Sequence, residues 1–225
     1  MKILSQHYSS YFGVPHEKFV NLGVYDGFVN EDSTLHINPL LLRKCTVPEF
    51  EGAYESFLNH FKPILLLADQ ASNPMYFKEI EKRFQFKEIP NTGLGYSNGS
   101  SGTGISGKLA RQLAESSVEV IKEGMRDPNF FAILSFIEEN IGADRISDMT
   151  ISILYRRFLI YTQRVAETIE IETRTFRDIE GNKYQLPVNK VNHKSILFIP
   201  DCLYVTSLWH VHSMTSLLYV IITTD

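Results

Sequence analysis

The chain has 225 residues, of which 44% are hydrophobic and 21% are charged, so it is long and apolar enough to bury the core of one domain. The 26 acidic residues outnumber the 22 basic ones, and a net charge of −4 excludes a protein held to nucleic acid by bulk positive charge, although a local basic patch remains open. The chain starts without the apolar run of a signal peptide, and its two cysteines, Cys45 and Cys202, match no metal-binding spacing. We therefore expect a cytoplasmic protein with free thiols.

A short helical or irregular lead-in is expected over residues 1–22, and a β-hairpin is predicted to follow it. Residues 22–37, LGVYDGFVNEDSTLHI, alternate apolar and polar side chains on both sides of the polar sequence NEDS. Alternation with period two is typical of a half-buried strand, and the polar centre predicts the turn.

The middle of the chain is predicted to be helical. Apolar residues recur there at helical spacing, with Pro63 expected to kink or divide the first helix and Ser147 to cap the last. The predicted helices cover residues 47–68, 75–86, 105–123, 127–142 and 147–168.

The chain returns to β structure after these helices. The segment TIEIETRTF alternates, RDIEGNKY has the composition of a turn, and YQLPV and SILFIP read as strands. The expected fold is thus α+β, with a mainly helical core, a small N-terminal β-hairpin and a C-terminal β region.

A glycine-rich loop, predicted for residues 93–107, is the first candidate site. It contains the pattern G-x-G-x-x-G and leads directly into a predicted helix. Glycines allow a backbone to approach a ligand closely, and the amides at a helix N-terminus attract anions. The candidate ligand-binding residues are Gly102, Thr103, Gly104, Ser106, Gly107, Lys108 and Arg111.

The context of this loop argues against two well-known nucleotide sites. A dinucleotide-binding turn or a P-loop follows a buried apolar strand, whereas the preceding sequence FKEIPNTGLGYSN is polar and contains a proline. Leu109 also stands where a P-loop needs a magnesium-binding hydroxyl. Two interpretations stay open: a phosphate site, and a flexible serine-glycine hinge between helices.

An acidic turn, EENIGADRISDM, is the second candidate site. Converging carboxylates can hold Mg²⁺, the one cofactor that the sequence suggests, and we consider Glu139, Asp144 and Asp148 as catalytic candidates, with Asp144 and Asp148 as metal ligands. The same acids can also cap helices and turns. The seven histidines are scattered and form no H-E-x-x-H motif.

Several stretches together resemble the N-terminal region of a family of large bacterial proteins associated with phage defence. They are NLGVYDGFVNEDSTLHINPLLL, TVPEFEGAYESF, LGYSNGSSGTGISGKLA, DPNFFAILSFIEENIGADRISDMT and YQLPVNKVNHKSILFIP. Longer members of that family resemble PD-(D/E)XK nucleases at the C-terminus. Because the glycine loop and DRISDM recur in the family pattern, the resemblance implies functional roles for Gly102, Gly104, Gly107, Asp144 and Asp148.

The chain departs from that pattern near its C-terminus. We expect one α+β domain over residues 1–200 and a tail over 201–225, in which residues 202–224 include no Asp, Glu, Lys or Arg. The tail is interpreted as the product of a truncation or frameshift, with a strand hairpin or a membrane segment as alternatives. No nuclease motif is apparent, so we expect no cleavage by this chain alone.

The expected function is recognition or regulation within a defence-type nuclease family, through a phosphate-bearing ligand, either nucleic acid or nucleotide, at the glycine loop. One alternative is a module that binds a partner protein of a defence system, with no ligand chemistry. The other is a stand-alone, metal-dependent phosphoesterase or nuclease. Whether the chain is an enzyme is left open, and no membrane association is expected.

Overall fold

The computed structural model of the protein describes residues 6–29, 31–33, 35–87, 92, 105, 107–132 and 143–206. Helices dominate these residues, and the strands form two separate antiparallel pairs, so the predicted α+β, mainly helical class is confirmed. The α-helices are α1 (Tyr8–Phe12), α2 (His16–Asn21), α3 (Ala53–Leu67), α4 (Pro74–Arg83), α5 (Lys108–Lys122), α7 (Ala143–Ile153) and α8 (Tyr155–Thr168). The 3-10 helices are η1 (Pro39–Lys44), η2 (Pro48–Phe50), η3 (Ala68–Gln70) and η4 (Asp201–Leu203). The strands are β1 (Leu35–Ile37), β2 (Thr173–Arg177), β3 (Lys183–Pro187) and β4 (Tyr204–Thr206).

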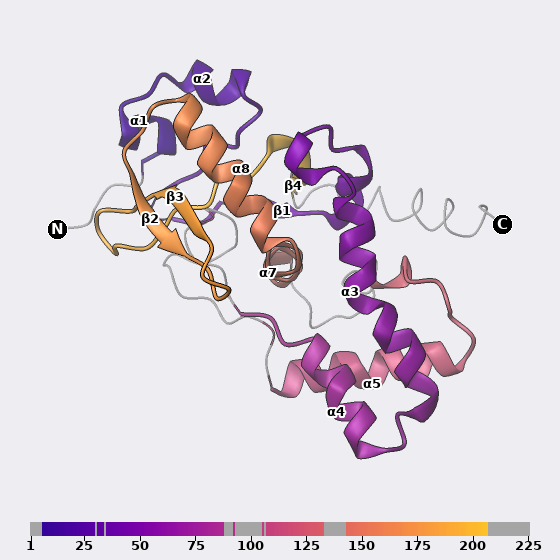
Figure 1. Ribbon diagram of the computed structural model, residues 1–225. Coiled ribbons are helices and arrows are strands. Elements are labelled where there is room, and N and C mark those ends of the chain that lie inside the picture. Colours follow the sequence, from indigo (N-terminus) through magenta and orange to yellow (C-terminus); the bar gives the residue numbers. More distant parts are fainter. Residues whose placement is uncertain are drawn as a thin grey trace.

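Helix α3 connects two parts of the molecule. It packs against η1 and α7 near the β1–β4 pair, and farther along the chain it contacts α4 and α5, which lie together at the far end of the molecule (Figure 1). Pro63 lies inside this single helix and does not divide it. Helices α4 and α5 begin close to their predicted positions. The side chain of Asn73 caps the start of α4, and α5 begins directly after Gly107.

The N-terminal strand does not form the predicted hairpin in the described residues. β1 pairs with β4, from the other end of the chain, in the register Leu35↔Thr206 and Ile37↔Tyr204. The upstream part of the expected hairpin bonds elsewhere, because the amide of Tyr25 donates to Ile199 at 2.9 Å. The alternating pattern thus indicated extended backbone correctly but did not specify its partner.

The C-terminal β region is confirmed as a hairpin of β2 and β3, with five paired positions. Its turn is closed by Asp178, whose carboxylate accepts the amides of Glu180 and Asn182 at 2.9 and 2.8 Å. Within the described residues, the predicted strand SILFIP forms isolated bridges at Ser195 and Pro200 and no ladder, and Ile196, Leu197, Phe198 and Ile199 are buried.

The predicted cap at Ser147 is wrong. This residue lies inside α7, which starts at Ala143, and its hydroxyl accepts the amide of Ile37 in β1 at 2.8 Å. A buried edge strand needs a partner for its outward-facing amide, and the serine of the covering helix supplies one.

The two ends of the described chain pack against each other around Phe198. Its fully buried ring contacts Tyr8, Phe12 and Phe19, with ring centroids 5.7, 6.3 and 5.6 Å away. Residues 201–206, which were predicted to begin the tail, continue this fold through η4 and β4, while the tail prediction for residues 207–225 falls outside the described residues. In the described part of the chain, no helix is both long and apolar enough to cross a membrane.

Two arginines of α8 attach this helix to the segment around η2. Arg157 donates to the carbonyl oxygens of Glu49 and Glu51 at 2.7 Å each, and Arg164 forms an ion pair with the Glu49 carboxylate. These contacts give both arginines an architectural role.

The ion pair between Arg164 and Glu49 makes stability depend on pH. Burial raises the pKa of the Glu49 carboxyl, but the hydrogen bond and charge of Arg164 lower it on balance. A lowered pKa stabilises the fold above the ordinary Glu value of about 4.3 and ceases to do so as pH falls through the folded value. We expect chemical denaturation to show that the stability difference between wild type and Glu49→Gln shrinks below about pH 4. A constant difference from pH 7 to pH 3 would contradict this assignment.

Candidate functional site

The described residues on either side of the glycine-rich stretch are joined by a backbone hydrogen bond. The amide of Phe86, just after α4, donates to the carbonyl of Ile105 at 2.8 Å, and both side chains are buried. This bridge joins a residue shortly after α4 to a residue shortly before α5. The candidates Gly102, Thr103, Gly104 and Ser106 lie outside the described residues.

The remaining candidates, Gly107, Lys108 and Arg111, lie at the start of α5. Gly107 precedes the helix with φ +52° and ψ −118°, and Lys108 and Arg111 are exposed, three residues apart on one helical face. The first turn of this 15-residue helix contains no acidic residue. Two full positive charges therefore add to the partial positive charge of the helix N-terminus.

The backbone at Gly107 gives a prediction for this end of α5. A side chain there is strained by the positive φ, although a Cβ would meet no atom within 4 Å. We expect Gly107→Ala to lower the free energy of unfolding by more than about 1 kcal/mol, measured by urea denaturation. Glu119→Ala, at an exposed position of the same helix, is the control and should change stability by less than about 0.5 kcal/mol. Equal effects of the two substitutions would contradict the assigned backbone conformation.

A groove runs between α4 and α5 beside this helix start. Its volume is about 690 Å³. It is lined by Pro74, Met75, Phe77, Lys78, Glu79, Glu81, Lys82, Gln85 and Arg111. The lining thus combines three basic side chains, two from α4 and one from α5, with Glu79 and Glu81, an aromatic ring and an exposed methionine.

The positive charges of this groove are accessible. Lys78 and Lys82 are exposed and four residues apart, so they project from one face of α4. Arg111 lies with its guanidinium 5.7 Å from the centroid of the Phe77 ring and pairs with Glu115 at 3.0 Å. The side chains of that pair are 63% and 55% exposed, so the pair is weak and a phosphate can compete for the arginine.

The acidic turn is only partly described. Glu139 and the side chain of Asp144 lie outside the described residues, and Asp148 is partly buried within α7. In the described part of the chain, no three His, Cys, Asp or Glu side chains are grouped as metal ligands, so Asp148 lies in no such group there. The Mg²⁺ hypothesis for these acids stays a prediction.

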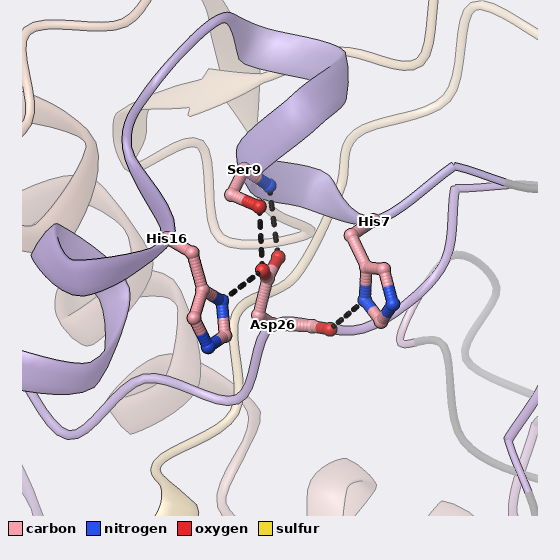
Figure 2. A network of polar contacts seen from close by, with 4 residues as sticks. All are labelled: His7, Ser9, His16 and Asp26. Atoms are coloured by element: carbon pink, nitrogen blue, oxygen red, sulfur yellow. Dashed lines mark hydrogen bonds and ion pairs between the residues drawn. The ribbon is translucent and has the colours of Figure 1, made fainter.

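A polar network around Asp26 was missed by the sequence analysis. Its nearly buried carboxylate accepts the amide of Ser9 at 2.8 Å, the hydroxyl of Ser9, and the Nδ1–H of His16 at 2.7 Å (Figure 2). The Nδ1–H of His7 donates to the backbone carbonyl of Asp26 at 2.7 Å. Three short segments, α1, α2 and the loop that contains Asp26, are thereby tied together.

This network has an architectural rather than a catalytic arrangement. Nucleophilic catalysis needs the hydroxyl to bond the histidine, whereas Ser9 and His16 both bond the same carboxylate in Figure 2. The His16 side chain is 63% exposed. The one sequence feature that could have indicated this network is that two histidines, a serine and an aspartate occur within the first 26 residues. Their spacing matches no known motif.

The fold and groove define a mainly helical α+β protein with a surface groove lined by side chains of both charges and an aromatic ring. A family model described as "Domain of unknown function (DUF8370)" matches residues 13–209, and the chain belongs to this family. Searches of curated proteins and of solved structures found no match.

Proposed function

We propose that the protein is a recognition domain that binds a phosphate-bearing ligand, a nucleic acid strand or a nucleotide, in the groove between α4 and α5. The observation that supports this proposal is the convergence of Lys78, Lys82 and Arg111 beside Phe77 in one groove. Lys108, at the start of α5, adds charge on the same helical face as Arg111.

The chemistry of the groove matches such a ligand. Lysine and arginine neutralise phosphates, and the N-terminus of a long helix adds favourable amide dipoles. An aromatic ring beside the cations offers a surface on which a base can stack.

The net charge of −4 limits the mode of binding. A protein with this charge does not hold a duplex through an extended basic face, so the ligand contacts a local site of a few phosphates. The resemblance to the N-terminal region of defence-associated proteins gives this site a role: recognition in the cytoplasm, with cleavage left to another segment or a partner protein of the system.

The proposal is tested by thermal denaturation with short single-stranded DNA, single-stranded RNA and nucleoside triphosphates, each with and without Mg²⁺. A ligand that binds only the folded state raises Tm, and at 100 times its Kd it stabilises by about 2.7 kcal/mol. We expect a Tm rise with at least one ligand, lost in Lys82→Glu and Arg111→Glu.

Lys122→Glu is the matched control, because it reverses a charge at the opposite end of α5. We expect this variant to keep the ligand-induced Tm rise. No shift with any ligand, or equal loss in all three variants, would contradict the proposal and favour a protein-interaction module.

A further inference from the structure

The two cysteines of the chain lie side by side in the fold. Cys45 and Cys202 are 157 residues apart in sequence, yet their sulfur atoms are 3.1 Å apart, and both thiols are free and partly exposed. Cys45 directly follows η1, and Cys202 lies in η4. The sequence analysis expected free thiols but did not predict that the two side chains would lie in contact.

The backbone on both sides holds this pair in position. The amide of Asn38, at the start of η1, donates to the carbonyl of Leu203 at 3.0 Å, next to Cys202. The register of the neighbouring strands places Ile37 opposite Tyr204. The two sulfur atoms need to approach by only about 1 Å to reach the disulfide bond length of about 2.05 Å.

We propose that Cys45 and Cys202 form a reversible intrachain disulfide by exchange with a low-molecular-weight disulfide such as oxidised glutathione. The bridge joins η1 to η4 and so fastens β4, which follows Cys202, to the part of the chain that contains β1. It closes a loop of 157 residues, and long loops gain the most from closure because the unfolded chain loses the most entropy.

The exchange takes place in two balanced steps. The Cys45 thiolate attacks one sulfur of oxidised glutathione, which breaks its disulfide bond and releases one glutathione thiolate. The Cys202 thiol then loses its proton to solvent, and the resulting thiolate attacks the Cys45 sulfur and releases the second glutathione as a thiolate. The protein loses two protons and two electrons, and two molecules of reduced glutathione carry them away.

The local electrostatics support Cys45 as the first nucleophile. The hydrogen bond that Cys202 donates lowers the pKa of the Cys45 thiol to about 7. The same interaction, together with burial, raises the pKa of Cys202. Since the thiolate is the reactive form, Cys45 reacts first near neutral pH.

The test is incubation of the full chain in glutathione buffers of increasing oxidised fraction, followed by intact-mass analysis under acid quench. We expect wild type to become a monomer that has lost two hydrogen atoms and carries no glutathione. Cys202→Ser should instead stop at a single glutathione adduct on Cys45. The proposal would be overturned if wild type carried two glutathione adducts or formed disulfide-linked dimers. It would also be overturned if wild type stayed unreacted in buffers that already modify Cys202→Ser.

A second measurement shows whether the bridge fits the native fold. Oxidised wild type is expected to melt about 5 °C or more above the reduced form, and dithiothreitol should reverse this shift. The Cys45→Ser/Cys202→Ser double variant should show no shift in the same buffers. A bridged monomer that melts below the reduced protein would overturn the proposal, because the bridge would then distort the fold.

Discussion

Replacing Phe61 with alanine is expected to lower the free energy of unfolding by about 3–5 kcal/mol. The Phe61 ring is fully buried and stacks on Phe131, with centroids 4.7 Å apart and planes inclined by 10°. Phe57 and Phe84 contact the same ring at 5.3 and 5.9 Å. Its removal leaves a cavity where α3, the end of α4 and the segment after α5 meet, and urea denaturation followed by circular dichroism measures the loss.

The control for Phe61→Ala lies on the same helix. Leu66 is 75% exposed, so Leu66→Ala removes a side chain of similar chemistry without opening a cavity, and its effect should stay below about 0.5 kcal/mol. If Phe61→Ala were no more destabilising than Leu66→Ala, the packing of α3 against α4 described above would be incorrect.

Replacing Asp26 with alanine is expected to be the second large loss, about 2–4 kcal/mol. The carboxylate accepts the amide and the hydroxyl of Ser9, and Ser9 itself is buried. Alanine leaves both donors without an acceptor and out of reach of water, and each unsatisfied buried group costs about 1–3 kcal/mol. Urea denaturation at neutral pH measures the difference.

His16→Ala separates the buried part of this network from its exposed part. His16 bonds the same carboxylate, but its side chain is 63% exposed, so we expect a loss of less than about 1 kcal/mol. Equal losses for Asp26→Ala and His16→Ala would show that the contribution resides in the surface pair and not in the buried bonds to Ser9.

The local elements of this protein could be predicted from the sequence, whereas their partners could not. Helical spacing of apolar residues indicated α3, α4 and α5, and alternation around a polar turn indicated the β2–β3 hairpin. The pairing of β1 with β4 and the contact of Ser147 with Ile37 join residues more than 100 positions apart. No periodicity within one segment encodes such a choice, because it depends on which buried faces meet.

The sequence predicted the α5 side of the candidate groove but not its α4 side. The glycine pattern and the charges that follow it predicted Gly107, Lys108 and Arg111 as candidates, and of these only Arg111 lines the groove. Lys78 and Lys82, on the other side of the groove, resembled an ordinary solvated helix face. They line the candidate groove together with Arg111 because α4 packs beside α5.

The most direct measurement of the proposed function is the salt dependence of nucleic-acid binding by the full chain. Fluorescence anisotropy of a labelled, short single strand would be recorded at several salt concentrations for wild type, Lys82→Ala, Arg111→Ala and the control Lys122→Ala. We predict that log K falls linearly with log salt for wild type, and that each groove variant binds more weakly with a slope shallower by about 0.7–1. Lys122→Ala should keep the wild-type slope. Absence of binding at low salt, or a slope that the groove variants leave unchanged, would contradict the proposal that the groove between α4 and α5 receives nucleic acid phosphates.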